Sequence, residues 1–262
     1  MKIVVCIKQV PDTTEVRIDP IKGTLIREGI PSIINPDDKN AIEEALKIKD
    51  KIEDTTVIAL TMGPLQSESA LREALAMGVD KGILLSDRKF AGSDTLATSY
   101  ILSSAIKKIE EYDIIFCGRQ AIDGDTAQVG PGIGEHLKIP QVTYVSSLDI
   151  NGKEVIVNRD IEEGSYVIKS KMPILLTAIK ELNEARYPSI SGIYKAHREK
   201  RIDIWTANDL DIDEEKIGLN GSPTKVKKSF TPSISSQGEI IEGTAEEASY
   251  KLVSKLREKQ II

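Results

Sequence analysis

The chain has 262 residues, a length that fits one large domain with an appendage, or two small domains, at about 150 residues per domain. Hydrophobic residues make up 40% and charged residues 29%, as in ordinary globular proteins, so disordered, collagen-like and coiled-coil classes are excluded. The 41 acidic residues outnumber the 35 basic ones, and the net charge is −6. Because no basic block dominates this charge, we expect neither nucleic acid nor an anionic membrane as a partner.

The cysteines and the N-terminal segment indicate the cellular compartment of the protein. Cys6 and Cys117 each lie in an apolar run and have no neighbour at metal-ligand spacing, so we expect free, buried thiols in a reducing compartment and no metal site. The first residues run directly into a strand-like segment without a signal sequence. No apolar stretch approaches the ~18 residues that span a bilayer. We therefore expect a cytoplasmic protein that does not insert into a membrane.

Strand-like and helix-like segments alternate along the first half of the chain. The strand-like runs are continuously apolar, which is typical of strands buried on both faces; they lie at residues 3–8, 57–62, 83–86 and 113–117. The segments with helical spacing lie at residues 38–52, 67–77 and 95–109, with Gly78 as a stop signal after the second. This alternation predicts an α/β fold with a doubly wound, mostly parallel sheet of the Rossmann-like or adenine-nucleotide α-hydrolase-like kind.

The pattern changes near residue 145. Residues 146–168 read as a β-hairpin insertion with Asn151-Gly152 in the turn, and residues 172–179 as another buried strand. Residues 180–201 are irregular and rich in charge, and residues 208–242 are polar. A capping box at residues 244–247 then opens an amphipathic helix. We therefore expect a main domain over residues 1–207 and an extended C-terminal arm, ending in a helix, over residues 208–262.

Most familiar catalytic patterns are absent from the sequence. It contains no Walker A run and no G-x-G-x-x-G after a strand. Its two histidines, His136 and His197, leave little material for a Ser-His-Asp triad or a two-histidine metal site. We expect His136 to be a surface or hydrogen-bonded helix residue and His197 to lie on a solvated, charged face. We assign no catalytic side chain.

The loop after the strand at 113–117 is the strongest candidate for a binding site. It contains glycine and aspartate over residues 118–131 and leads into a helix that carries Val129, Ile133 and Leu137. If Asp125 or Thr126 caps that helix, the N–H groups of residues 127–129 are free to bind phosphate. An ordinary capped helix explains the same spacing equally well. Further loops at 35–38 and 62–64 follow the same edge of the predicted sheet, where open α/β sheets bind ligands.

Several motifs together resemble those of the electron-transfer flavoprotein β subunit. They are the run from Gly118 to Pro131, the Asn35-Pro36 helix entry, Ala74-Leu75-Ala76-Met77-Gly78-Val79-Asp80 and Leu182-Asn183-Glu184-Ala185-Arg186-Tyr187-Pro188. The resemblance covers nearly the whole chain. It implies a partner α subunit that carries its own FAD, and no enzymatic activity of the β chain alone.

The family resemblance offers two ligands for the same pocket. In the housekeeping branch the pocket holds AMP, and in the electron-bifurcating branch of anaerobes it holds a second FAD that takes a hydride from NADH. The sequence of residues 16–38, together with that of residues 121–131, resembles the bifurcating branch. Carried over position by position, the cofactor-binding residues are Cys6, Asn35, Pro36, Asp37, Asp38, Met62, Gly118, Arg119, Gln120, Ala121, Ile122, Asp123, Gly124, Asp125, Thr126, Ala127, Gln128 and Val129.

The resemblance also implies partners. Residues 183–197 resemble the family's recognition loop, with Ile190 at its apolar anchor, although the family usually has leucine there. The leading hypothesis is a subunit whose FAD accepts a hydride from NADH. It then sends one electron to ferredoxin or flavodoxin and the other, through the α-subunit FAD, to an acyl-CoA dehydrogenase or enoyl-CoA reductase. The alternatives are an AMP-bearing β subunit and, more distantly, a non-redox adenine-nucleotide sensor.

Overall fold

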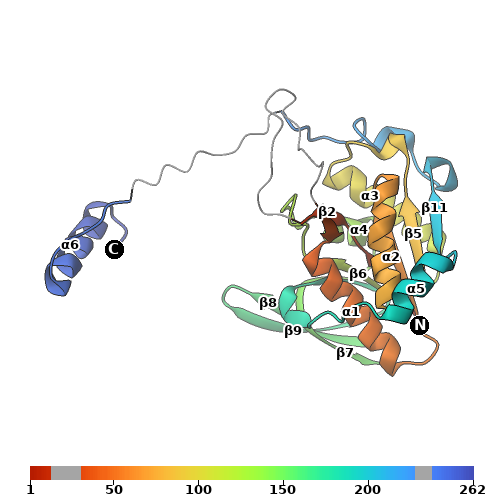
Figure 1. Ribbon diagram of the computed structural model, residues 1–262, viewed down its shortest axis with the longest axis horizontal. Coiled ribbons are helices and arrows are strands. Elements are labelled where there is room, and N and C mark those ends of the chain that lie inside the picture. Colours follow the sequence, from red (N-terminus) through yellow and green to blue (C-terminus); the bar gives the residue numbers. More distant parts are fainter. Residues whose placement is uncertain (13–30, 228–237) are drawn as a thin grey trace. The chain divides into compact units, whose positions relative to one another are not determined.

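A nine-stranded sheet is the centre of the fold in the computed structural model, which describes residues 1–12, 31–227 and 238–262 (Figure 1). Its strands follow in the order β11 (Ile202–Trp205), β5 (Lys81–Leu85), β4 (Thr56–Met62), β1 (Lys2–Cys6), β6 (Ile114–Gly118), β10 (Ile174–Ala178), β7 (Gln141–Asn151), β8 (Glu154–Ile161) and β9 (Gly164–Lys171). The strands from β11 to β7 are parallel to their neighbours, and β8 and β9 continue the sheet antiparallel. A separate antiparallel pair joins β2 (Gln9–Pro11) to β3 (Ser32–Ile34).

Helices cover both faces of the parallel part of the sheet. One face packs against α1 (Pro36–Lys51), α2 (Glu68–Met77) and α5 (Ile190–Arg198), and the other against α3 (Thr95–Ile109) and α4 (Val129–Leu137). Short 3₁₀ turns lie at Leu65–Ser67, Arg88–Phe90, Lys180–Leu182, Ala207–Asp209 and Glu214–Lys216. The predicted doubly wound α/β fold is confirmed.

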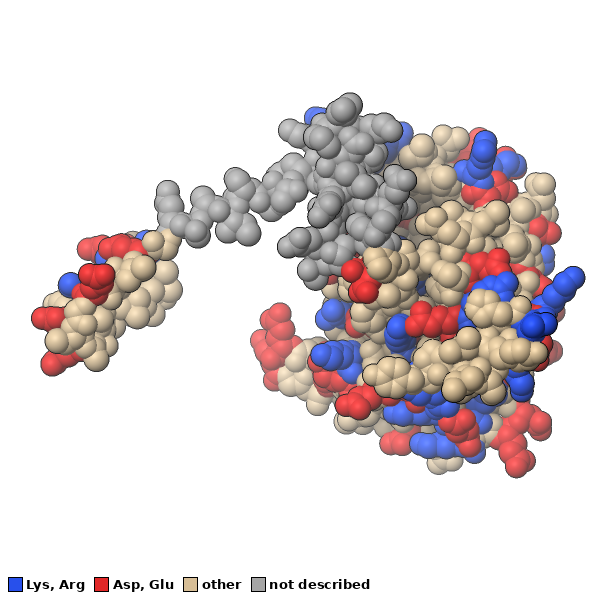
Figure 2. Space-filling view, in the orientation of Figure 1, with Lys and Arg blue, Asp and Glu red and all other residues tan. Residues whose placement is uncertain are grey.

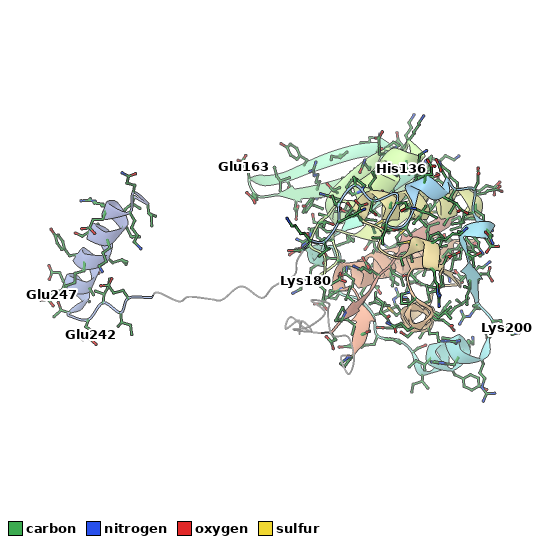
Figure 3. All side chains as sticks on the ribbon, turned by 90° about the horizontal axis from the view of Figure 1, so that it is seen from above. His136, Glu163, Lys180, Lys200, Glu242 and Glu247 are labelled. Carbon is green, nitrogen blue, oxygen red and sulfur yellow. The ribbon has the colours of Figure 1, made fainter. Side chains whose placement is uncertain are left out.

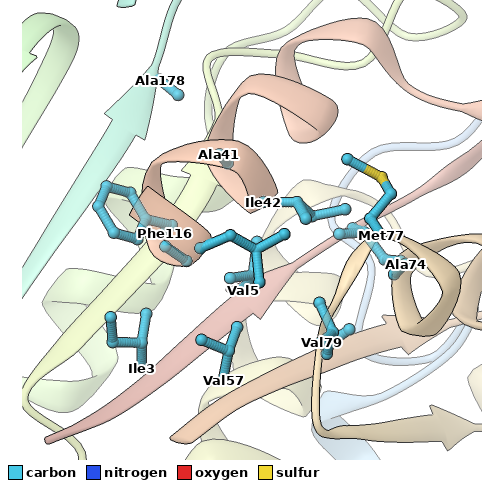
Figure 4. Close-up of a cluster of buried hydrophobic side chains, with 14 of the residues drawn as sticks. Ile3, Val5, Ala41, Ile42, Val57, Ala74, Met77, Val79, Phe116 and Ala178 are labelled. Carbon is cyan, nitrogen blue, oxygen red and sulfur yellow. The ribbon is translucent and has the colours of Figure 1, made fainter. Parts of the chain in front are cut away.

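Alternation along β1 divides the core into two clusters. Ile3 and Val5 face the α1 and α2 side, whereas Val4 and Cys6 face the α3 and α4 side. Figure 4 shows Val5 beside α1, with Phe116 of β6 in the same cluster. Burial of an aliphatic side chain of this size contributes about 1.5–3 kcal/mol relative to its exposure, so both clusters favour this strand register.

The antiparallel end of the sheet is longer than the sequence indicated. The predicted turn at Asn151-Gly152 joins β7 to β8, and Gly152 adopts the left-handed φ of 61° that such a turn needs. A third strand, β9, then pairs with β8 over its whole length, and Glu163 lies in the turn between them (Figure 3). The insertion is therefore a three-stranded meander instead of a two-stranded hairpin.

Residues expected to be irregular contain a helix. Within the segment 180–201, α5 begins at Ile190, and the hydroxyl of Ser189 caps it by accepting the N–H of Gly192 at 2.9 Å. The helix packs on α2, where Arg72 donates to the carbonyl of Ala196 at 2.6 Å. The expectation of irregular structure was wrong there because the apolar contact that stabilises this short helix comes from a distant part of the chain.

The main unit extends through Lys227, beyond the boundary expected at residue 207. Leu210 and Ile217 are buried in the cluster on the α3 side, and the hydroxyl of Ser222 accepts the N–H of Asp94 at 2.8 Å. Residues 208–227 therefore pack with the main unit. Lysines, arginines and acidic residues are interspersed over the face of this unit shown in Figure 2.

The second compact unit contains α6 (Ala245–Glu258). The predicted capping box is present: Thr244 Oγ1 accepts the N–H of Glu247 at 3.3 Å, and Glu247 (labelled in Figure 3) accepts the N–H of Thr244 at 3.0 Å. No residue of α6 is buried among the described residues, and Leu252 is 49% exposed. Across the ranges that the structure describes, no helix has the length and apolar character needed to cross a membrane.

Candidate functional site

A cavity of about 370 Å³ lies at the carboxyl ends of β1 and β6. From β1 the chain builds one half of the parallel sheet through β4 and β5, while β6 begins the other half toward β10. Crevices at such switch points are where open α/β sheets bind ligands. The predicted residues that line the cavity are Cys6, Asp38, Met62, Gly118, Arg119, Gln120, Ala121, Gly124, Thr126, Ala127, Gln128 and Val129.

Asp38 joins the two strands beneath this cavity. Its carboxylate accepts the N–H of Lys8 at 2.7 Å, just after β1, and the N–H of Gly118 at 3.0 Å, at the end of β6. The side chain is buried, and burial raises its pKa to about 7, although the hydrogen bonds from Asn35, Lys8 and Gly118 oppose that rise. Asp38 therefore braces the ends of two strands.

Asn35 holds the glycine-containing loop through hydrogen bonds to its backbone. It is fully buried, donates through Nδ2 to the carbonyl of Gln120 at 2.8 Å and accepts the N–H of Ile122 at 3.1 Å. These bonds satisfy a backbone donor and a backbone acceptor of the loop, so the side chain fixes the loop against the start of α1. Asn35 therefore supports the cavity without lining it.

The remaining predicted residues do not line the cavity either; they are Pro36, Asp37, Ile122, Asp123 and Asp125. Asp37 pairs with Arg119 at 3.4 Å, and burial raises the pKa of Asp37 while Arg119 opposes the rise. Asp123 pairs with Lys8 at 2.6 Å. These contacts fasten the loop to its surroundings.

The helix after the loop begins later than expected. α4 starts at Val129 with Gln128 at the N-cap position, and no side chain caps it. Asp125 instead accepts a hydrogen bond from the side chain of Gln120, so the prediction that Asp125 or Thr126 caps the helix was wrong. The cause is the backbone: Asp125 and Ala127 both have a left-handed φ of 52°, which delays the helix.

This irregular backbone leaves a row of N–H donors without partners in the part of the chain that the structure describes. Among the described residues, the N–H groups of residues 126–130 donate no hydrogen bond. Successive N–H groups around left-handed residues form concavities that bind anions, and a helix N-terminus adds to the positive potential. Gly130 also allows close packing, since a Cβ there would lie 2.8 Å from the Cγ2 atom of Thr177. The donor set therefore suits a phosphate or pyrophosphate group.

The structure adds lining residues that the sequence analysis missed. They are Ile7, Lys8, Ser93, Asp94, Thr95, Thr98, Leu102, Cys117 and Gly130. Five of them, residues 93–102, come from the beginning of α3, where Asp94 caps the helix by accepting the N–H groups of Leu96 and Ala97. The Gly-Ser-Asp-Thr run at 92–95 was the available signal, because it places a capped helix after β5 in the chain.

The two thiols meet in the cavity floor. Cys6 and Cys117 occupy paired positions of the adjacent strands β1 and β6, and both are free and buried. A hydrogen bond with Cys6 and burial both raise the pKa of Cys117. The expectation of buried free thiols is confirmed. These side chains give the floor an uncharged surface.

The two histidines lie outside the cavity lining. His136, labelled in Figure 3, is on α4, and its ring packs edge-on against Tyr100 with the centroids 5.7 Å apart. Burial lowers the pKa of its imidazole below the ordinary value. His197 is in the last turn of α5. Neither has a place in the candidate site.

Ile190 lies on a separate surface. It is 89% exposed at the start of α5, and Tyr187 beside it is 94% exposed. Large apolar side chains with this much exposure, three residues apart in the chain, suit contact with a protein partner. The structure thus places the predicted anchor on a helix end instead of a loop.

Comparison with known proteins identifies the family. A model described as the electron transfer flavoprotein domain matches residues 22–210. The chain is 58% identical to the electron transfer flavoprotein subunit beta of Thermoanaerobacterium thermosaccharolyticum, with all of both chains covered. This chain belongs to the electron transfer flavoprotein family, as a β subunit.

Two further relatives of this electron transfer flavoprotein β subunit bear the names of reductase complexes. One is the caffeyl-CoA reductase-Etf complex subunit CarD of Acetobacterium woodii, 55% identical over the full length of both chains. The other is the acryloyl-CoA reductase electron transfer subunit gamma of Anaerotignum propionicum, 48% identical with all of both chains covered. The resemblance inferred from the sequence motifs is confirmed.

Proposed function

We propose that this β subunit forms a heterodimer with an α subunit and holds FAD in the cavity between β1 and β6. NADH is the electron donor, and the acceptors are ferredoxin or flavodoxin and, through FAD of the α subunit, an acyl-CoA dehydrogenase or enoyl-CoA reductase. A bound flavin supplies the chemistry, because it accepts an electron pair and releases single electrons. The protein is proposed to act in the cytoplasm.

The row of free N–H groups carries this proposal. Residues 126–130 offer backbone donors to the two phosphates of a dinucleotide, and Asn35 and Asp38 keep the loop in place. Asp94 and Thr95 at the start of α3 add polar groups to the lining, and Cys6, Met62 and Leu102 add apolar surface for a ring. Positioning and electrostatic tuning of the cofactor are the tasks left to the protein.

The proposed partners rest on two other features. The reductase names of two relatives support an acyl-CoA dehydrogenase or related reductase as the acceptor, with Ile190 and Tyr187 as the apolar contact. The exposed apolar face of α6 supports the proposal that an α subunit packs against this helix, because amphipathic helices in proteins gain most of their stability from tertiary packing.

AMP is the second candidate ligand. A single phosphate also suits the donors of residues 126–130, so the geometry of the loop accepts either nucleotide. The relatives from anaerobes with reductase names favour FAD.

The identity of the bound nucleotide tests the proposal directly. The heterodimer is purified with its cognate α chain, denatured, and the released nucleotides are identified and counted by chromatography and mass spectrometry. Two FAD molecules per heterodimer, with bound flavin reduced on addition of NADH, are expected. One FAD together with AMP would reject the bifurcating assignment and support the second candidate. A heterodimer with neither ligand in the β subunit would reject both.

A further inference from the structure

The residues just before α5 are tied to α1 by a polar network. Asn40 donates through Nδ2 to the carbonyl of Asn183 at 2.6 Å, and Asn183 donates back to the carbonyl of Asn40 at 3.0 Å. Asn183 also donates to Glu44 at 2.9 Å. This reciprocal amide pair joins two segments more than a hundred residues apart in the sequence.

Arg186 makes the strongest contact of this network. Its Nε and Nη2 atoms donate to the two carboxylate oxygens of Glu43 at 2.8 and 3.0 Å, and its backbone N–H donates to the same carboxylate at 3.0 Å. Nη2 also donates to Asp50 at 2.8 Å. The Glu43 side chain is 6% exposed, and these bonds raise the pKa of Arg186 above its already high value. A fork of charge-assisted bonds to a buried carboxylate fixes orientation as well as distance.

Helix α1, which carries Glu43, also begins at the proposed cofactor cavity. Asn35 and Asp38 hold the ends of β1 and β6 and the loop after β6, as described above. Glu43 follows Asp38 by five residues, which is about 7.5 Å along a helix axis. Helix α1 therefore carries Asp38, which braces the cavity, in its first turn, and Glu43, which binds Arg186, in the turns that follow.

Residues 183–186 lead directly to the exposed apolar surface. Tyr187 follows Arg186 in the chain, and Ile190 lies three residues further, at the start of α5. The far end of α5 is held on α2 by the bond between Arg72 and the carbonyl of Ala196. Close packing at Gly192, where a Cβ would lie 2.2 Å from the carbonyl oxygen of Ala76, holds the middle. On the N-terminal side, the N–H of Ser189 donates to the carbonyl of Ala76 at 3.4 Å, and the bonds of Arg186 and Asn183 to α1 hold the residues before it.

We propose that Arg186, acting through Glu43 of α1, is a positioning residue that fixes the docking surface of Tyr187 and Ile190 relative to the cofactor cavity. The inference rests on the proposed docking role of Ile190. A partner that docks on a fixed surface meets the cavity at a set distance, and no ordering of the surface is needed at the moment of binding.

The test uses the heterodimer with its cognate α chain and the variant Arg186→Met. Hydrogen exchange of residues 183–190 is expected to become about tenfold faster or more, because bonds to charged groups are lost. With a purified acyl-CoA dehydrogenase that couples to the parent, KM for the dehydrogenase is expected to rise about tenfold, while kcat and nucleotide content stay within about twofold. A general loss of stability would lower kcat and the nucleotide content as well. A rise in KM alone therefore distinguishes a displaced docking surface from a destabilised protein.

Controls address folding and the helix itself. Arg186→Met leaves the carboxylate of Glu43 without its partner, so the double variant Glu43→Gln/Arg186→Met provides a form in which neither charge remains. Lys39→Met is the matched control, since it breaks the 2.7 Å ion pair of α1 with Glu73 and does not touch residues 183–186. Exchange and KM in this control are expected to equal those of the parent.

Two results would overturn the inference. Unchanged exchange at residues 183–190 in both Arg186 variants would show that other contacts hold the segment. Faster exchange with an unchanged KM would show that its position does not matter for docking. The proposed docking role has its own test, because Ile190→Ala leaves the Arg186 network intact. An unaffected KM in that variant would reject the docking role of Ile190. The exchange data would still show whether Arg186 holds residues 183–190 in place.

Discussion

The N–H of Gly118 donates to the carboxylate of Asp38 at 3.0 Å, and no larger residue fits in place of this glycine. A Cβ at position 118 would lie 2.2 Å from Oδ1 of Asp38 and 2.8 Å from its backbone nitrogen. The first turn of α1 can therefore press against the end of β6. This close approach forms one wall of the cavity and allows a single carboxylate to join β6 to the end of β1.

We expect Asp38 to make stability depend on pH. Because burial raises its pKa to about 7, the native protein keeps the carboxyl proton up to neutral pH, whereas the unfolded chain releases it near pH 4. The stabilising contribution is therefore full below about pH 4 and is lost as pH rises to about 7. Asp38→Asn removes this titration, although it also loses one acceptor. Between about pH 5 and pH 7.5, the Tm of the parent heterodimer should fall relative to that of the variant by on the order of 5 °C. Parallel Tm curves would contradict this prediction.

Ala127→Glu is expected to abolish ligand binding in the β subunit and to leave the fold intact. The new carboxylate would lie among the free N–H groups of residues 126–130 and compete with the phosphates for them. Ala127 already has a positive φ, so the longer side chain adds no new backbone constraint. The variant should contain one flavin per heterodimer where the parent contains two, as measured by absorbance after denaturation. Ala127→Gly is the control and should keep both flavins; two flavins in Ala127→Glu would place the phosphates elsewhere.

Removal of residues 238–262 should abolish assembly with the α chain and spare the main unit. This deletion takes away α6, whose residues are all at least partly exposed in the described structure. The longer deletion of residues 208–262 should instead destabilise the main unit, since it removes the buried side chains of Leu210 and Ile217. Co-purification with a tagged α chain and thermal unfolding measure the two effects. A stable heterodimer without residues 238–262 would show that α6 is not required for assembly.

Ile190→Ala is expected to weaken coupling to an acyl-CoA dehydrogenase and to leave reduction of bound flavin by NADH unchanged. Truncation of an apolar interface anchor costs roughly 1–3 kcal/mol, which corresponds to about tenfold or more in apparent affinity. The matched control is Leu65→Ala, an exposed leucine in the 3₁₀ turn before α2. Steady-state titration with the dehydrogenase gives the affinity. Equal values for the parent and Ile190→Ala would move the anchor to another residue of this surface.

The elements with the clearest sequence patterns were predicted well. Continuous apolar runs identified β1, β4, β6 and β10, because strands covered by helices on both faces need apolar residues at every position. The capping box at Thr244 and the turn at Gly152 were also predicted from local sequence, since both depend on contacts within a few residues. In contrast, α5 has only Ala196 buried, and its packing on α2 comes from residues far away in the chain.

For the site, the sequence by itself determined the family and the loop that follows β6, because these depend on residue order. The tertiary structure decided how the residues of that loop divide between lining and support. Asn35 and Asp37 were predicted as ligand contacts and instead hold the loop through hydrogen bonds or ion pairs. The beginning of α3 also lines the cavity, although the sequence marked residues 92–95 only as a capped helix start. Left-handed backbone at Asp125 and Ala127 moved the helix start to Val129, which freed the row of N–H groups. The roles of Asn35 and Asp38 depend on side-chain contacts between segments eighty or more residues apart, which local spacing does not encode.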